Sequence, residues 1–242
     1  MKILGIIPAR YSSSRFPGKP LTDIGGKSMI QRVYEQAEKC KLLSAVFVAT
    51  DDDKIFERVM AFGGQVRMTA KHNSGTERCN ALFQDLKKEF DLIINIQADE
   101  PFINPEQISQ VTRLFEHEET AITTLVKQIK TVEELLDENI VKVVLDENNF
   151  ALNFSRLPMP QPKSFDAEEW FVLNKFYKHI GFYGYKAKVL KEISKLEPSQ
   201  NEISKNLEQL RWLENGYKIK VGITEFESIS IDVPKDIEKL NL

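Results

Sequence analysis

Short, nearly continuous apolar runs alternate with helix-like segments through the first half of the chain. The apolar runs predict buried strands at residues 2–7, 45–49, 65–68 and 92–96. Between them, apolar residues recur at helical spacing and predict helices at residues 28–40, 52–62 and 76–90. Strands that are apolar on both faces are typical of a mostly parallel sheet with helices on either side. The alternation therefore predicts a doubly wound α/β fold.

The second half of the chain has a more mixed pattern. Strands are expected at residues 141–145, 150–154, 179–185 and 218–223, and helices at residues 105–117, 188–195 and 202–214. A Pro-rich break from Leu157 to Pro162 interrupts the series, and strand-like segments resume after it. We therefore expect one domain over residues 1–242 with a small mixed lobe, which includes an excursion from the sheet at about residues 151–200.

Composition narrows the class of protein. The chain of 242 residues is 42% hydrophobic and 29% charged, and its formal net charge is −3. A mildly acidic chain lacks the broad basic face that nucleic-acid binding usually needs. Its two cysteines, Cys40 and Cys79, form no CxxC pair, and no apolar run is long enough for a membrane span. We expect a reduced, cytoplasmic protein without membrane insertion or a nucleic-acid partner.

The segment after the first expected strand carries three cations and three hydroxyl groups. A loop at this position lies at the carboxyl edge of the sheet, where α/β proteins bind ligands. Arg10, Ser13, Arg15 and Lys19 belong to it and are suited to a polyphosphate. Neither a P-loop nor a GxGxxG motif is present. On composition alone, the same segment also fits a solvated basic loop.

Other polar residues have both a functional and a structural interpretation. Asp99 closes an apolar strand, where it suits either magnesium or a turn, and Asp232 precedes a short helix that it can cap. His179 and Tyr183 share one strand face, which fits a polyhydroxylated ligand or an exposed or dimer-facing surface. The segment from Ser74 to Arg78 is typical of a helix start, with Thr76 and Glu77 as capping residues.

The expected helix at 202–214 combines an apolar stripe with polar flanks. Its stripe is predicted to face the core and consists of Ile203, Leu207, Leu210 and Leu213. Glu208 and Gln209 flank this stripe on opposite sides, where most residues are solvated. The pattern alone assigns them no ligand.

Taken together, eight motifs in order resemble the 3-deoxy-manno-octulosonate cytidylyltransferases, also called CMP-KDO synthetases. They are Pro-Ala-Arg-Tyr-x-Ser-x-Arg-Phe-Pro-Gly-Lys-Pro-Leu, Ser-Gly-Thr-Glu-Arg, Gln-x-Asp-Glu-Pro, Val-Lys-Val-Val-Leu-Asp, Phe-Ser-Arg, His-Ile-Gly-Phe-Tyr-Gly-Tyr, Leu-Glu-Gln-Leu-Arg and Asp-x-Pro. The series runs from Pro8 to Pro234 and so spans essentially the whole chain. The resemblance implies the nucleotide-diphospho-sugar transferase type of α/β fold.

The resemblance also implies a reaction and a set of site residues. Such enzymes join the acid sugar 3-deoxy-manno-octulosonate (KDO) to CTP with Mg²⁺, giving CMP-KDO and pyrophosphate for lipopolysaccharide synthesis. The triphosphate would contact Arg10, Ser13, Arg15 and Lys19. The cytosine would contact Ser74 and Arg78. The metal would be shared by Asp99 and Asp232, which are the implied catalytic residues together with Lys19 and Arg15. The sugar acid would contact Arg156, His179, Tyr183, Glu208 and Gln209, with Gln97 near the junction of both substrates. The resemblance and the excursion after Leu157 make a homodimer the expectation.

The chain departs from the family pattern at three points. Ala98 replaces the usual Gly, Val233 replaces the usual Thr, and Gln161-Pro162-Lys163-Ser164 stands where an Arg-Asp pair is usual. The last departure concerns the sugar side, so 8-amino-KDO or another acid sugar is an alternative substrate. A catalytically silent nucleotide-binding module is the alternative from another class.

Overall fold

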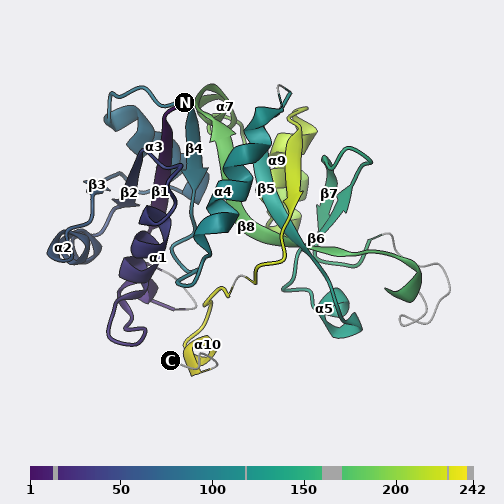
Figure 1. Cartoon of the computed structure of the whole chain (residues 1–242), viewed down its shortest axis with the longest axis horizontal. Coiled ribbons are helices and arrows are strands. Elements are labelled where there is room, and N and C mark those ends of the chain that lie inside the picture. The colour runs from purple at the N-terminus through teal and green to yellow at the C-terminus, as the bar shows by residue number, and fades with distance from the viewer. Residues whose placement is uncertain (13–15, 118, 160–170, 228, 239–242) are drawn as a thin grey trace. The chain divides into compact units, whose positions relative to one another are not determined.

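The computed structural model describes residues 1–12, 16–117, 119–159, 171–227 and 229–238 (Figure 1). The chain forms two compact units. Unit 1 consists of Met1–Ser109, Gly184–Ser194 and Ser228–Leu242, and unit 2 of Gln110–Tyr183 and Lys195–Glu227. Within the described ranges, no helix has both the length and the apolar character needed to cross a bilayer.

Unit 1 is built on parallel strands in the order β3-β2-β1-β4. These strands are β1 (Ile3–Ala9), β2 (Ala45–Thr50), β3 (Val66–Met68) and β4 (Leu92–Asn95). Ile3, Leu4, Ile6 and Ile7 of β1 are all buried, as expected for a strand with neighbours on both edges and helices on both faces. The prediction of a parallel, doubly wound sheet in the first half of the chain is therefore confirmed.

The helices of unit 1 connect or flank these strands, and α2 and α3 begin at polar side chains that cap them. They are η1 (Lys19–Leu21, a 3₁₀ helix), α1 (Met29–Glu38), α2 (Asp53–Ala61), α3 (Gly75–Asp85), α7 (Ala187–Ile193) and α10 (Lys235–Glu238). The Asp52 carboxylate accepts a hydrogen bond from Ile55 N at the start of α2. Helix α3 ends earlier than predicted, and Lys87 shortly beyond it has a left-handed φ of 48°. Helix α4 (Pro105–Arg113) crosses the boundary between the units.

Unit 2 contains a mixed set of strands. They are β5 (Ile122–Gln128), β6 (Lys142–Leu145), β7 (Ala151–Ser155), β9 (Ile219–Ile223) and most of β8 (Tyr177–Lys186). Strands β5 and β9 pair in parallel, whereas β6 pairs antiparallel with β7 and with β8. The short helices are η2 (Leu114–Glu116), α5 (Val132–Leu136), α8 (Gln200–Lys205) and α9 (Gln209–Glu214). The mixed lobe expected from the sequence is confirmed.

Three expectations for the second half need correction. Strand β5 and helix α5 were not predicted, although β5 is almost wholly buried. The single helix expected at 202–214 is two helices, because Asn206 adopts a left-handed conformation with φ 52° and ψ 53° and ends α8. The end of α8 at Asn206 also interrupts the apolar stripe that was predicted to face the core, since Ile203 is 63% exposed while Leu207 and Leu210 are buried. Gln209, expected to be solvated, is buried as well.

Candidate active site

A cavity of about 280 Å³ lies in unit 1 at the carboxyl ends of β1 and β4. The cavity is lined by residues 8–10, 19–20, 72–75, 78, 97–99 and 232. This is the edge of a parallel sheet at which α/β folds bind ligands. Seven of the residues singled out from the sequence meet here: Arg10, Lys19, Ser74, Arg78, Gln97, Asp99 and Asp232. Ser13 and Arg15, predicted for the same site, lie outside the described residues.

Lys19 lies between the two aspartates that are far apart in the sequence. Its Nζ is 2.7 Å from Asp99 Oδ2 and 3.6 Å from Asp232 Oδ1. Lys19 begins η1 directly after Gly18, whose left-handed φ of 71° and hydrogen bond from its N–H to Tyr11 O turn the chain into the cavity. The structure thus brings Asp99 and Asp232 to the same ammonium group, while their role as shared metal ligands stays a prediction.

The segment before Asp232 is fixed by packing and by one backbone hydrogen bond. Ile231 is fully buried against Ile24 and Met29, and its N–H donates to Asp99 O at 3.0 Å. Asp236 Oδ2 accepts hydrogen bonds from Asp232 N and Val233 N, which ties the backbone of this segment to the start of α10. The Asp232 carboxylate reaches Lys19, with its Oδ1 3.6 Å from Nζ.

The carboxylate pair has the chemistry of a magnesium site. Magnesium prefers hard oxygen ligands, usually one or two carboxylates completed by substrate phosphates and water. Asp99 and Asp232 supply two such groups around one point of positive charge. Among the residues that the structure describes, no group of three or more His, Cys, Asp or Glu side chains is arranged to hold a metal. The residues present fit a metal that the substrate helps to coordinate.

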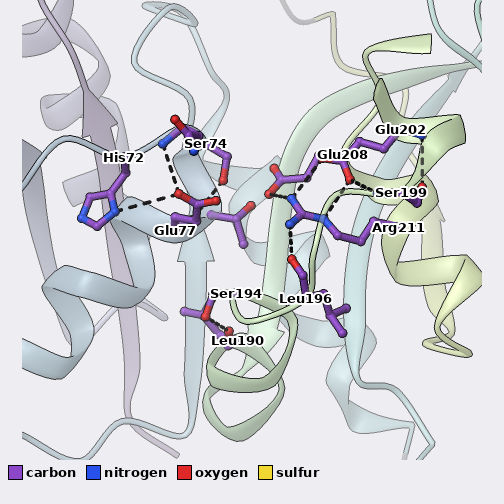
Figure 2. A network of polar contacts seen from close by, with 12 residues as sticks. His72, Ser74, Glu77, Leu190, Ser194, Leu196, Ser199, Glu202, Glu208 and Arg211 are labelled. Carbon is purple, nitrogen blue, oxygen red and sulfur yellow. Dashed lines mark hydrogen bonds and ion pairs between the residues drawn. The ribbon is translucent and has the colours of Figure 1, made fainter. Parts of the chain in front are cut away.

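The start of α3 forms another wall of the cavity. Figure 2 shows the side chains of Ser74 and Glu77 there, beside His72. Ser74 is the N-cap, and its Oγ accepts a hydrogen bond from Glu77 N at 3.2 Å. The Glu77 carboxylate accepts from Asn73 N and lies 4.0 Å from His72 Nδ1. Glu77 thus takes part in the helix start as expected, whereas the capping hydroxyl belongs to Ser74 and not to Thr76, which is buried. The N–H groups of a helix start favour an anion nearby.

Arg78, on the same helix, is only 3% exposed and has its guanidinium held from two sides. Nη2 is 3.2 Å from Asp51 Oδ2, and Nη1 donates to Thr69 Oγ1 at 2.8 Å. A buried guanidinium fixed in this way presents its remaining donors in a constant direction. Asp51 and His72 were not recognised in the sequence, because nothing in its pattern connects Asp51 with Arg78.

The residues predicted to bind a sugar acid gather in unit 2. His179 and Tyr183 on β8 lie with ring centroids 5.2 Å apart, and Tyr183 packs edge-on against Trp212 of α9 at 5.0 Å. His179 Nε2 is 3.0 Å from Thr124 Oγ1. Burial lowers the pKa of His179 to about 3, so the ring is neutral at physiological pH.

The other three sugar-side residues belong to the same unit. Arg156, after β7, donates from Nε to Lys205 O and from Nη1 to Glu138 O. Glu208 precedes α9, and Gln209 is its first residue. Figure 2 shows the carboxylate of Glu208 directed at Arg211, whose Nη2 is 3.2 Å from Glu208 Oε1. Arg211 was quoted in a motif but given no role from the sequence.

Comparison with known proteins decides the family. The family model described as "Cytidylyltransferase" matches residues 4–220 of this chain. The chain belongs to the cytidylyltransferase family. Its nucleotidyltransferase character follows from this membership, and the cavity at the carboxyl edge of the unit 1 sheet lies within the matched region, apart from Asp232.

Two curated relatives match this cytidylyltransferase over nearly its whole length, and they share one name. A protein from Parabacteroides distasonis is 54% identical, with 99% of this chain and 96% of that protein covered. One from Bacteroides thetaiotaomicron is 51% identical, with 98% of this chain and 96% of that protein covered. Both are named 3-deoxy-manno-octulosonate cytidylyltransferase.

Solved structures agree on the fold. A structure titled CMP:2-keto-3-deoxy-manno-octonic acid synthetase complexed with CTP has a TM-score of 0.90 and 39% identity, covering 99% of this cytidylyltransferase and 96% of that chain. A glucose-1-phosphate thymidylyltransferase from Bacillus anthracis, titled as putative, has a TM-score of 0.65 at 17% identity, covering 98% and 93% of the two chains. The second likeness concerns the α/β fold alone.

Proposed function

We propose that this cytidylyltransferase transfers CMP from CTP to KDO and releases pyrophosphate. One observation carries the proposal: Lys19 contacts both Asp99 and Asp232 in a cavity that also receives the start of α3. A nucleoside triphosphate requires cations and helix N–H groups for its phosphates, and its metal requires carboxylates. The cavity offers all three kinds of group. The names of the relatives supply the sugar.

The reaction exchanges one oxygen–phosphorus bond for another. The anomeric hydroxyl of KDO attacks the α-phosphorus of CTP and loses its proton, while the bond from the α-phosphorus to the departing pyrophosphate breaks. Lys19 and Arg10 bind the triphosphate and neutralise its charge as pyrophosphate leaves, and the start of α3 adds backbone donors. Ser74 and Arg78 contact the cytosine. Ser13 and Arg15 are assigned to the triphosphate by sequence alone.

Asp99 and Asp232 would hold Mg²⁺ on the phosphate side of this cavity. Bound Mg²⁺ would supply charge neutralisation on the phosphates and a lowered pKa of the attacking hydroxyl. In the free protein, Lys19 neutralises the same two carboxylates, so the site is held together without the metal. Lys19 is then available to a phosphate when another cation takes over the aspartates.

The sugar acid is assigned to unit 2. Arg156 supplies the positive charge for the carboxylate of KDO, because a guanidinium pairs with a carboxylate in two hydrogen bonds. His179, being neutral, binds through a hydrogen bond rather than an ion pair. Tyr183, Glu208 and Gln209 are suited to hydroxyl groups. Gln97 lines the cavity of unit 1 and is assigned to the substrates by sequence.

A homodimer, a cytoplasmic location and a role in lipopolysaccharide synthesis complete the proposal. They rest on the family resemblance and on composition. The sugar-side excursion contains residues 160–170, which lie outside the described residues. The excursion's assignment to sugar binding and dimerisation stays a prediction, to be checked by light scattering.

The test is turnover with defined substrates. The full chain, CTP, KDO and Mg²⁺ should give pyrophosphate and a phosphodiester signal from CMP-KDO in a phosphorus NMR spectrum. Removal of Mg²⁺ with EDTA should stop the reaction, and UTP should replace CTP poorly. Turnover of 8-amino-KDO in preference to KDO would redirect the proposal to that sugar. A folded protein that turns over no acid sugar would leave only a nucleotide-binding module.

A further inference from the structure

A buried arginine connects three parts of unit 2 next to the residues assigned to the sugar (Figure 2). Arg211 is 3% exposed and lies on α9. Its Nη2 donates a hydrogen bond to Glu202 Oε1 at 3.0 Å, and its Nε lies 2.9 Å from Glu202 Oε2 as an ion pair without hydrogen-bond geometry. Nη1 donates to Leu196 O at 2.5 Å. Nη2 also reaches Glu208 Oε1 at 3.2 Å.

The local sequence fixes both partners of this arginine. Glu202 belongs to a capping box at the start of α8, in which Ser199 Oγ accepts from Glu202 N and the Glu202 carboxylate accepts from Ser199 N. Asn206 ends α8 in a left-handed conformation, and Glu208 at the start of α9 has helical dihedral angles, so its side chain reaches Arg211 one turn later on the same helix face. The capping box holds Glu202, the main partner of Arg211, in place. Arg211 contacts Glu208 through one hydrogen bond.

A guanidinium with this much burial must be paired, and Glu202 together with Leu196 O already pairs it. The additional contact with Glu208 therefore has its main effect on Glu208, whose side chain is held in one direction. A carboxylate that is held before the ligand arrives loses less conformational entropy when it accepts hydrogen bonds from sugar hydroxyls.

We propose that Arg211 is a positioning residue for the sugar acid, which acts by orienting the Glu208 carboxylate. The inference rests on the proposed function, because Glu208 is assigned to the sugar there. Arg211 does not touch the substrate in this proposal. The competing interpretation is that Arg211 only joins α8 to α9 through Glu202.

Two conservative variants separate these interpretations. Arg211→Lys keeps the charge but cannot maintain the contacts with Glu202, Leu196 O and Glu208 together. We expect the KM for KDO to rise about tenfold, as for the loss of one hydrogen bond, with the KM for CTP changed less than about twofold. Glu202→Gln keeps Arg211 and its contact with Glu208, so its KM for KDO should stay within about twofold of wild type. Arg67→Lys is the matched control, because Arg67 contacts Val66 O and the Phe47 ring on β2 and β3.

The decisive comparison places Arg211→Lys in a Glu208→Gln background. Positioning through Glu208 predicts that the substitution then has little further effect on the KM for KDO. An equal effect in both backgrounds, an unchanged KM for KDO in Arg211→Lys, or an increase in Glu202→Gln as large as that in Glu208→Gln would overturn the inference. The comparison of Glu202→Gln with Glu208→Gln needs no Arg211 variant, so it remains decisive if Arg211→Lys does not fold. Wild-type protein that binds KDO in calorimetry but releases no pyrophosphate would instead overturn the proposed function, and the same KM comparisons would then be made as dissociation constants.

Discussion

Replacing Lys19 by Met would remove a cation from two carboxylates while keeping the length of the side chain. Lys19 Nζ is 2.7 Å from Asp99 Oδ2 and 3.6 Å from Asp232 Oδ1. The side chain of Lys19 is 14% exposed, compared with 27% for Asp99 and 45% for Asp232. The bond to Asp99 is thus the stronger contribution, and solvent screens the contact with Asp232.

The expected loss of stability follows from these two contacts. A charge-assisted hydrogen bond of this kind contributes about 1.5–3 kcal/mol, and the partial exposure of Asp99 favours the lower end. The longer, more exposed contact adds at most about 0.5 kcal/mol. We therefore expect a loss of about 2 kcal/mol in the free energy of unfolding, or roughly 4–8 °C in Tm for a chain of this size.

Magnesium should recover part of this loss. In wild-type protein, Mg²⁺ must displace the Lys19 ammonium from the aspartates, whereas in Lys19→Met the two carboxylates repel each other until a cation binds. Millimolar Mg²⁺ without nucleotide should therefore raise the Tm of Lys19→Met more than that of wild type. Differential scanning fluorimetry with and without Mg²⁺ measures both effects.

Lys27→Met is the matched control. Lys27 is 2.6 Å from Glu35, but their side chains are 45% and 36% exposed, so its removal should cost less than about 1 kcal/mol and leave the response to Mg²⁺ unchanged. The reasoning is refuted if Lys19→Met loses no more stability than Lys27→Met. An equal Mg²⁺-dependent rise in Lys19→Met and wild type would refute the shared cation site.

Three further substitutions address the two units separately. Asp99→Asn should lower kcat by about 100-fold or more by removing a metal ligand, whereas Asp85→Asn, at the exposed end of α3, should leave it unchanged in a steady-state assay. Arg78→Lys should raise the KM for CTP about tenfold with the KM for KDO unchanged, because lysine cannot hold Asp51, Thr69 and a base together. Burial lowers the pKa of His179 from 6.5 to about 3, so the unfolded state takes up a proton as the pH falls below 6.5 while the folded state does not until about pH 3. Across that window, wild type should lose up to about 1.4 kcal/mol of unfolding free energy per pH unit relative to His179→Gln, as measured by urea unfolding. Parallel pH profiles of the two proteins would contradict a His179 that stays neutral in the folded state.

The sheet of unit 1 could be predicted from the sequence because its strands are apolar on both faces and separated by amphipathic helices. Each of the predicted strands at residues 2–7, 45–49, 65–68 and 92–96 corresponds to one of β1 to β4, with shifts of up to two residues at the ends. Strand β5 could not be recognised as easily, since its buried Thr123 and Thr124 interrupt the apolar run. Helices α8 and α9 appeared as one helix because their spacing continues through Asn206, whose left-handed conformation depends on the fold.

The candidate site, too, could be predicted from the sequence only in part. The resemblance to a family brought Asp99 and Asp232 into one prediction, although more than half of the chain separates them in sequence. The cation between them could not be predicted, because the position of Lys19 depends on the left-handed turn at Gly18, and that of Asp232 on the buried Ile231. Arg211 was missed for a similar reason, since its partner Glu202 belongs to a different helix.

A crystal of the full chain grown with CTP and Mn²⁺ and measured for anomalous scattering would place the divalent cation directly. The proposed site predicts an anomalous peak within coordination distance of a carboxylate oxygen from both Asp99 and Asp232, with a CTP phosphate as a further ligand. Lys19 Nζ should then contact a phosphate oxygen instead of the aspartates. A manganese peak that touches neither carboxylate, beside a well-ordered nucleotide, would contradict the shared metal site.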